Sequence, residues 1–316
     1  MQSLLIKSFK TVAGLLMLMP ATAAFAQNDG DDLSKLLDEE KPKKTYTYGS
    51  FKTGHIINSH SIENTAKGNL DFRISHRFGA LNGGVKEFFG LDGATLRLGL
   101  DYGVTNWLTV GVGRSSLYKE YDGFLKARIL RQTEKDEMPL SLSYVGGMSL
   151  TSQKATDLVG RQLTPFESYP FSNRLFFFNQ LLIARKFSNL FTLQLMPTHV
   201  HYNLVDTKAD PNDIFALGAG GRLRLSKRVT FNVEYFYQFS QLTGTTNSLG
   251  AGFDIETGGH VFQLFCTNSI GMTERMFIGQ TTDKWQKGAI HFGFNISRIF
   301  TVVKPKGFEN SRNKIW

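Results

Sequence analysis

Strict alternation of apolar and polar residues over residues 94–114 constrains this chain most. In the first half, every second residue is apolar, at Leu96, Leu98, Leu100 and Tyr102. After a turn at 104–106 the alternation resumes, with Leu108, Val110 and Val112. Because successive side chains of a strand point to opposite faces, this pattern predicts an antiparallel hairpin with one apolar and one polar face.

The first 26 residues are organised like a cleaved secretory signal. A basic start at Lys7 and Lys10 precedes a short apolar run, 12–19, and a small-x-small cleavage site follows at 24–26. The alternative interpretation is a membrane helix, which needs about 20 apolar residues. The run is too short for that, so we expect export and cleavage after residue 26. With no cysteine beside the site, we expect no lipid anchor there.

Behind the signal, composition divides the chain into three predicted parts. Residues 27–45 are polar and charged and predict a disordered leader. Residues 46–303 form the predicted β-barrel domain, and 304–316 a C-terminal tail. Within the domain, residues 46–65 are either a short strand or a segment tucked into the mouth of the barrel.

From residue 68 onward the alternation predicts about twelve antiparallel strands. Their lengths suit tilted membrane strands, which need about 9–11 residues. Long and short connections alternate, as in outer-membrane barrels with short periplasmic turns and longer outer loops. The connection at 133–139 fits this rhythm least well. The predicted spans are 69–79, 94–103, 107–115, 122–132, 140–151, 174–187, 191–204, 214–225, 229–239, 248–256, 260–268 and 288–302.

These patterns together predict an all-β fold, a transmembrane antiparallel up-and-down β-barrel of about twelve strands in the outer membrane. The alternative is a soluble periplasmic or secreted sandwich or barrel with its apolar face inward. Soluble barrels of the lipocalin kind have about eight strands, so the strand number and the connection lengths favour the membrane version. We also expect a β-bulge near Pro197, where the alternation changes parity, which would re-aim His199 and His201.

The polar face, which would line the lumen, carries many charges. Enclosed by a low-dielectric wall, its basic residues would favour small anions. Alternatively, its acidic residues pair with them and fill the lumen with salt bridges. The formal net charge of the chain is +9, to which the signal contributes Lys7 and Lys10. The predicted lumen-facing charges are Asp71, Arg73, Arg77, Arg97, Asp101, Lys126, Arg128, Arg222, Arg224 and Glu234.

Motifs for chemistry are scarce. His199 and His201 stand two apart on one strand and are weak candidates for binding zinc or haem iron, but no third ligand is fixed by spacing. Cys266 is the one cysteine, which excludes a disulfide framework. The sequence has no nucleophile-elbow motif and no phosphate-binding glycine motif. We therefore expect no cofactor and no catalytic residue, and the net charge alone does not support nucleic-acid binding.

Two stretches, 56–79 and 90–115, resemble an uncharacterised β-barrel family of Bacteroidota-type outer membranes, a domain of unknown function. They include KGNLDFRISHRFG at 67–79 and GLDGA at 90–94. The resemblance covers about residues 45–303 and implies a barrel without a mechanism. It also implies a polar cluster inside the barrel, and it adds Arg114 to the lumen-facing charges. The cluster would comprise His60, Glu63, His76 and Asp92.

The sequence therefore predicts a passive channel or small-solute binder in the outer membrane, with membrane lipid and small anionic solutes as partners. One alternative is a structural or docking barrel with a filled lumen. It would engage a periplasmic protein through the leader or through the loops 152–173 and 269–287. A weaker alternative is an outer-membrane enzyme.

Overall fold

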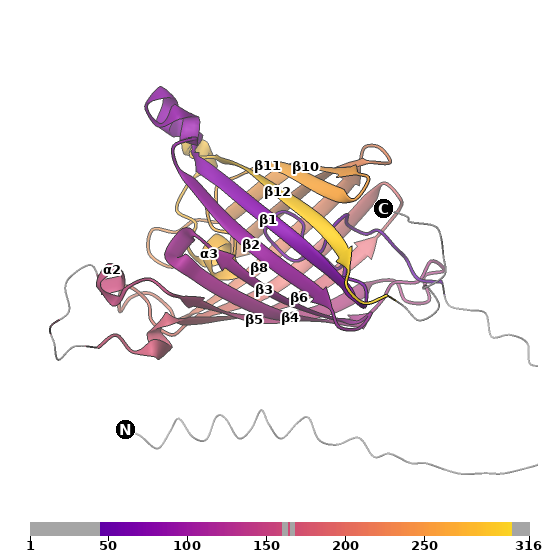
Figure 1. Ribbon diagram of the computed structural model, residues 1–316, viewed down its shortest axis with the longest axis horizontal. Helices are drawn as coiled ribbons and strands as arrows, with labels where there is room; N and C mark the ends of the chain where they lie inside the picture. Colours follow the sequence, from indigo (N-terminus) through magenta and orange to yellow (C-terminus); the bar gives the residue numbers. More distant parts are fainter. Residues whose placement is uncertain (1–44, 160–163, 165–167, 305–316) are drawn as a thin grey trace, which may run out of the picture. The chain divides into compact units, whose positions relative to one another are not determined.

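The computed structural model describes residues 45–159, 164 and 168–304 (Figure 1). The predicted signal peptide lies outside these residues, as do the predicted leader and tail apart from Thr45 and Lys304.

The described chain forms a closed antiparallel barrel in which each strand pairs with its neighbours in sequence and β1 pairs with β12. This confirms the predicted fold class. The strands are β1 (Asn69–Ala80), β2 (Ala94–Gly103), β3 (Leu108–Ser115), β4 (Glu120–Leu130), β5 (Ser141–Thr151), β6 (Leu175–Lys186), β7 (Phe191–Tyr202), β8 (Asp213–Arg224), β9 (Val229–Gln238), β10 (Ser248–Thr257), β11 (His260–Thr267) and β12 (His291–Thr301).

The two faces of the wall are the reverse of those in a soluble protein. On β2 the apolar residues Leu96, Leu98 and Leu100 are exposed on the outside, whereas Arg97 and Asp101 are buried inside. An outward apolar face around a polar interior is favourable where lipid covers the outside. Among the described residues, no helix is long and apolar enough to cross a membrane.

The connections are short at one end of the barrel and mostly long at the other. Four tight connections share the first end: 104–107, 187–190, 225–228 and 258–259. The exception there is 131–140, the segment predicted to fit least well. Its backbone pairs with the N-terminal segment, through the bridge Tyr46–Thr133, so its length serves a contact inside the chain.

The long connections at the opposite end carry short helices. Among these, η3 (Leu81–Gly90) follows β1, and α3 (Glu274–Gly279) lies between β11 and β12. The other helices there are η4 (Leu117–Lys119), α2 (Ala155–Val159), η5 (Phe171–Arg174) and η6 (Trp285–Lys287).

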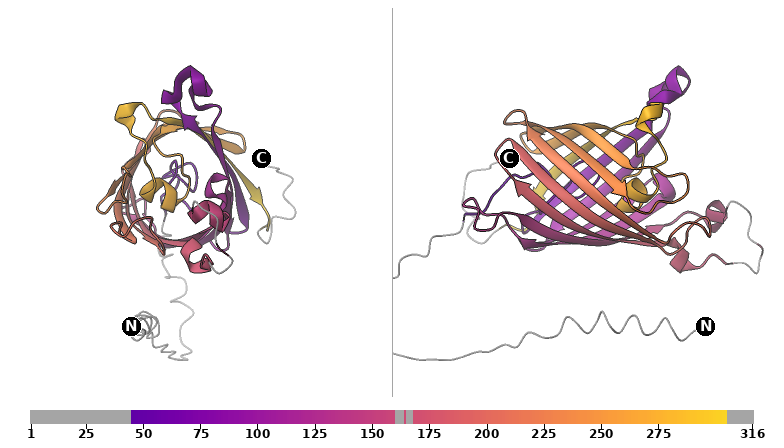
Figure 2. Two further views of the ribbon diagram at one scale, coloured as in Figure 1. Left: turned by 90° about the vertical axis from the view of Figure 1, so that its left-hand side faces the viewer. Right: turned by 180° about the vertical axis from the view of Figure 1, so that it is seen from behind.

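Residues 46–67, which we call the plug, enter the barrel at the short-turn end and turn back inside it (Figure 2). We call that end the plug mouth and the opposite end the far mouth. The turn of the plug is closed by hydrogen bonds from Ile56 N to Ser59 O (2.8 Å) and from Ser61 N to Gly54 O (2.9 Å). Of the two interpretations of residues 46–65, the structure thus shows the segment tucked into the barrel.

Residues 268–290, which we call the inward loop, fold α3 into the lumen from the far mouth (Figure 2). Apolar side chains of the plug and of α3 form one buried cluster with the wall. It includes Ile56, Ile57 and Ile62 of the plug, Phe277 and Ile278 of α3, and Met196, Val200, Tyr202 and Phe236 of the wall.

The predicted bulge at Pro197 is wrong. The pairing of β7 with β8 runs without a shift from Phe191–Leu223 to His201–Asp213. The apparent change of parity has a different cause, because the inward residues Met196, Val200 and Tyr202 belong to this apolar cluster. A polar lumen becomes apolar where the inward loop packs against it.

Candidate functional site

The tip of the plug is bound by one wall carboxylate. Glu234 of β9, only 1 % exposed, accepts hydrogen bonds from the backbone N–H groups of Ile57 (3.3 Å), Asn58 (2.9 Å) and Ser59 (3.1 Å). The Ser59 hydroxyl donates a fourth, at 2.7 Å. Hydrogen bonds to an ionised group are stronger than neutral ones, so this carboxylate fixes the position of the tip.

Donors elsewhere on the wall bind the carbonyl groups of the same tip. Arg73 of β1 and Asn295 of β12 donate to Ile57 O, at 3.3 and 3.1 Å. Gln263 of β11 donates to Ile56 O at 2.8 Å. The plug therefore meets complementary groups on separate parts of the wall.

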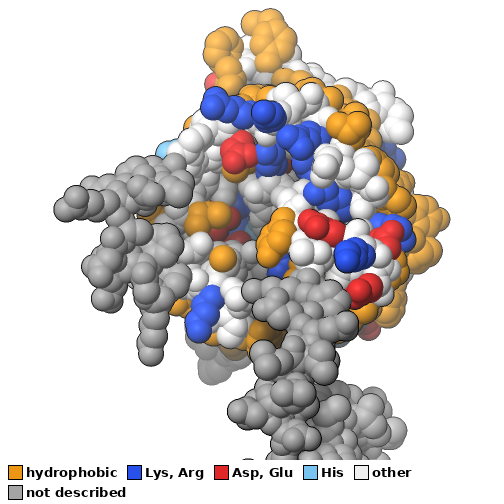
Figure 3. Space-filling view, turned by 90° about the vertical axis from the view of Figure 1, so that its right-hand side faces the viewer, with side chains coloured by type: hydrophobic (Ala, Val, Ile, Leu, Met, Phe, Trp, Pro, Cys, Tyr) orange, Lys and Arg blue, Asp and Glu red, His pale blue; other side chains and the backbone are white. Residues whose placement is uncertain are grey.

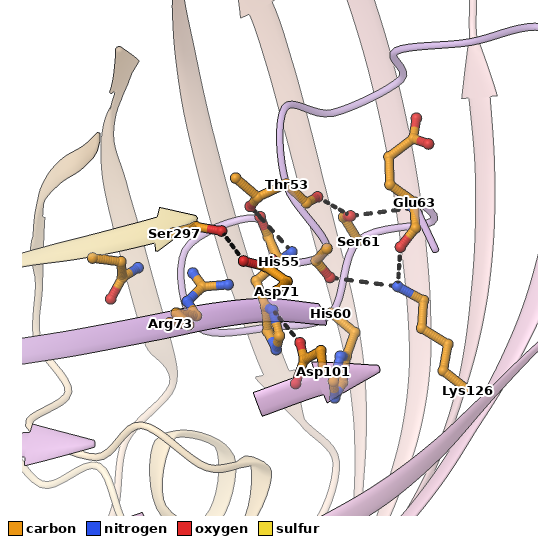
Figure 4. A network of polar contacts seen from close by, with 12 residues as sticks. Thr53, His55, His60, Ser61, Glu63, Asp71, Arg73, Asp101, Lys126 and Ser297 are labelled. Carbon is orange, nitrogen blue, oxygen red and sulfur yellow. Dashed lines mark hydrogen bonds and ion pairs between the residues drawn. The ribbon is translucent and has the colours of Figure 1, made fainter. Parts of the chain in front are cut away.

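The legs of the plug are held in the same way. Lys126 of β4 donates to the carbonyls of Glu63 and Gly54 (Figure 4). Arg222 of β8 donates to Gly49 O at 2.7 Å and to Ser50 O at 3.0 Å. These basic residues, predicted from sequence to face a solute, bind the backbone of the chain itself.

The lumen also contains paired charges. Arg97 makes two hydrogen bonds to Asp122, one of them 2.9 Å from Nε to Oδ1. Gly113 opposite makes room for this pair, since a Cβ there would lie 2.3 Å from Arg97 Nη2. The buried basic side chains of the described barrel are Arg73, Arg77, Arg97, Lys126, Arg222 and Arg275, and the buried acidic ones Asp71, Asp101, Glu120, Glu234, Asp254 and Glu274. Buried basic and acidic residues are thus equal in number.

Plug and inward loop meet at a junction formed by His55, His60 and Glu274. The two histidine rings lie 4.5 Å apart, and His60 Nε2 is 3.4 Å from Glu274 Oε1. Burial, with nearby Arg73 and Lys126 respectively, lowers the pKa of His55 and of His60 well below 6.5. Burial raises the pKa of Glu274 to about 8. All three groups are therefore mainly uncharged near neutral pH.

Little space remains at this junction. A cavity of about 20 Å³ lies there, lined by both histidines, Glu274 and wall residues such as Arg97 and Phe124. That volume suits about one water molecule. Wider cavities lie on either side, about 370 Å³ toward the plug mouth and about 790 Å³ toward the far mouth.

The inward loop has its own buried anchor, which sequence reasoning missed. Arg275 contacts Glu120 of β4 through Nε (2.7 Å) and Nη2 (2.6 Å), and its guanidinium lies 3.9 Å from the ring centre of Phe176. Tyr202 donates to Arg275 O at 2.6 Å. The sequence feature that points to this anchor is a pair of charged residues, Glu274 and Arg275, in an otherwise uncharged stretch of a long connection.

The structure places most of the predicted lumen charges on the inner face. Asp71, Arg73, Arg77, Arg97, Asp101, Lys126, Arg222 and Glu234 are buried there, and Arg128 and Arg224 lie at the plug mouth beside the turns after β2 and β8. The prediction that Arg114 faces the lumen is wrong. It is exposed on the outer face, where its Nε donates to Tyr121 Oη at 3.3 Å.

The predicted polar cluster is not formed. His60 and Glu63 both belong to the plug, but His76 points outward and stacks on Phe294, with ring centres 5.0 Å apart. Asp92 is exposed in the connection between β1 and β2. His76 shares the parity of the outward residues of β1, and Asp92 lies beyond the strand, so neither can reach the lumen.

The weak metal candidates, His199 and His201, lie on the outer face. Each contacts Asp213 Oδ1, at 2.8 and 2.7 Å. Within the described part of the chain, no group of three or more His, Cys, Asp or Glu side chains is arranged to hold a metal ion.

Several solved structures are similar to this chain at low identity. The NanC porin is 8 % identical over 74 % of this chain and 100 % of its own, with a TM-score of 0.45. The KdgM porin is 10 % identical over 73 % and 99 % (TM-score 0.44). An outer membrane channel from Pseudomonas putida F1 is 12 % identical over 76 % and 98 % (TM-score 0.44).

No curated protein matches the sequence significantly. A family described as "Membrane bound beta barrel domain (DUF5777)" matches residues 51–300. The match includes the plug from residue 51 and nearly all of the barrel. The chain therefore belongs to this family of membrane-bound β-barrel domains.

Proposed function

We propose that the protein is an outer-membrane channel for small polar solutes that its own plug holds closed. The main observation behind this proposal is that two segments of the chain, the plug and the inward loop, occupy the lumen. A cavity of about 20 Å³ lies where the plug meets the inward loop, and the wall residues that line it are mainly polar.

The character of that wall supports a hydrated passage. Buried hydroxyls of Thr109, Ser143, Thr192 and Thr230 have no hydrogen-bond partner among the described residues. In a permanently filled core such groups are normally paired or replaced by apolar ones. Polar interiors of membrane barrels, in contrast, line water-filled channels.

The attachment of the plug supports its release. The wall closes on itself through strand pairing alone. In the described chain, the plug forms one isolated β-bridge within its own turn, and Tyr46–Thr133 is its one isolated β-bridge to another segment. Its other contacts with the wall are mainly hydrogen bonds from side chains and apolar packing, so the barrel can persist when the plug leaves.

Charge selectivity in such a channel is weak in the lumen, where acidic and basic residues are equal in number. The predicted preference for anions then rests on the plug mouth, where Lys and Arg side chains gather (Figure 3). The basic side chains at this mouth include Lys52, Arg128, Lys135, Arg185, Lys186, Arg224, Lys227 and Arg228, and the acidic ones Glu63, Glu134, Asp136 and Glu256.

The second candidate function is a docking barrel with a permanently filled lumen. The apolar cluster that joins Ile56, Ile57 and Ile62 of the plug to Phe277 and Ile278 of α3 favours it. Burying such side chains stabilises each by about 1.5–3 kcal/mol, which opposes release of the plug.

A reversible cross-link separates the two functions. Lys52 of the plug forms an ion pair with Glu256 of β10. With Cys266 replaced by Ala, Lys52→Cys and Glu256→Cys can be joined by a short reducible bismaleimide. We expect small sugars to enter proteoliposomes through the free protein, to be stopped by the linker and to enter again after reduction.

The single variant Lys52→Cys, treated with the same reagent, is the matched control and should keep its permeability. Entry of sugar that ignores the linker, or no entry in any state of a correctly folded barrel, contradicts the proposal. The second of these results is the one that the docking barrel predicts.

A further inference from the structure

The connection after β1 exposes a group of large apolar side chains. In η3 (Leu81–Gly90), Val85, Phe88 and Phe89 are 79 %, 59 % and 52 % exposed. Contiguous apolar patches on a protein surface mark sites of interaction with proteins or membranes. This patch lies outside the lumen, so the proposed channel does not account for it.

The backbone fixes these rings in their exposed positions. Phe88 and Phe89 have φ angles of 45° and 54°, a region that residues other than glycine adopt rarely. The base of η3 is tight, because a Cβ on Gly90 would lie 2.2 Å from Gly79 O. Strained conformations persist where the surrounding structure enforces them and are concentrated at functional sites.

The position of η3 identifies what it contacts. Figures 1 and 2 show it projecting beyond the circumference of the barrel, beside β1 and β12, rather than over the lumen. Its start is tied to the end of the inward loop, just before β12, by a hydrogen bond from Leu81 N to Ile290 O of 2.9 Å. An outward aromatic pair, Phe78 and Phe292, continues the apolar surface from η3 down the wall. A segment that projects outward from the rim of a lipid-covered barrel lies above the surrounding lipid and can contact it.

We propose that η3 is a membrane anchor in which Val85, Phe88 and Phe89 insert among the acyl chains around the barrel. Exposed lysines lie on and near it (Lys86, Lys284 and Lys287), but the exposed acids Glu87 and Asp92 oppose them. The binding energy therefore comes mainly from burial of apolar surface and not from headgroup charge. This inference is independent of whether the barrel conducts.

Depth-dependent quenching tests the anchor. With Cys266 replaced by Ala, Val85→Cys carries an environment-sensitive fluorophore, and the barrel is placed in phosphatidylcholine nanodiscs with or without brominated acyl chains. The matched control is Lys208→Cys, an exposed position in the connection between β7 and β8 at the same mouth. We expect blue-shifted emission at position 85, quenched by brominated lipid and protected from iodide, and the opposite at position 208.

A second variant excludes an effect of the label. Adding Phe88→Ser and Phe89→Ser should abolish the lipid quenching at position 85 while the heat-modifiable gel mobility of the folded barrel persists. Iodide quenching at position 85 equal to that at position 208, or protection from iodide without quenching by brominated lipid, overturns the proposal. The latter result indicates that η3 is covered by protein, either the barrel itself or a second copy of it.

Discussion

Glu234 illustrates how much of the plug's attachment depends on single wall residues. Its buried carboxylate satisfies three consecutive backbone N–H groups and one hydroxyl. A hydrogen bond to a charged group stabilises by about 1.5–3 kcal/mol. Removing the acceptor also leaves N–H groups buried without a partner, which costs more than the bond contributes.

Glu234→Gln should loosen the tip of the plug without unfolding the barrel. Glutamine offers one acceptor oxygen and places an NH₂ group against backbone donors. We expect the local opening free energy to fall by about 2 kcal/mol, on the order of 30-fold faster amide exchange. Hydrogen exchange of Ile57, Asn58 and Ser59 measures it. Glu256→Gln, at the partly exposed ion pair with Lys52, is the control and should change little. Equal protection in both variants contradicts this role.

At the level of single residues, the alternation of the strands was a better guide than motif positions. It assigned Arg73, Arg97 and Lys126 to the inner face, where the structure places them. Arg114 and His76 entered the predicted site through a resemblance. Each shares the parity of outward apolar neighbours, such as Val112 for Arg114 and Ile74 for His76. Period-2 geometry alone would have excluded both.

At the level of elements, the plug and the inward loop are the two segments that occupy the lumen, and neither contributes a strand to the barrel wall. Sequence could predict the strands because each repeats a local pattern. The plug is held largely through its own backbone, by wall residues more than 170 positions away in the case of Glu234. Such contacts leave no pattern of residue types in the plug, which is why residues 46–65 remained ambiguous.

The junction of these two elements should make the plug sensitive to pH in both directions. In the seated plug the pKa of His55 and of His60 is lowered, so both side chains stay neutral there. In a released plug the same side chains bind protons below about pH 6.5. Attachment is thus lost as the pH falls below that value. The pKa of Glu274 is raised to about 8 when the plug is seated. Its contribution to attachment of the plug is therefore complete below its ordinary pKa of 4.5 and is lost as the pH rises through 8. Attachment is tightest near pH 6.5.

The open probability in planar bilayers between pH 4.5 and 9 checks this dependence. It should be lowest near pH 6.5 and rise on both sides. His60→Gln should flatten the acid limb, and Glu274→Gln the alkaline limb. A profile that neither substitution alters would show that other groups control the plug.

At the level of the whole molecule, the structure combines a wall that closes through its own strand pairing with two segments that occupy its lumen. Strand number, connection lengths and the outward apolar face followed from sequence, and membership in a membrane-bound barrel family agrees with them. Whether the lumen is open could not follow from sequence. It depends on where two irregular segments meet, around His60 and Glu274.

The conductance of a barrel without its plug tests the central claim most directly. Removing residues 50–64 deletes the re-entrant segment but leaves all strands and their pairing in place. Heat-modifiable mobility first establishes that the variant is folded. In planar bilayers we expect long-lived conductance steps with weak ion selectivity, against rare brief openings in the intact protein. A folded variant that stays as silent as the intact barrel would contradict the account.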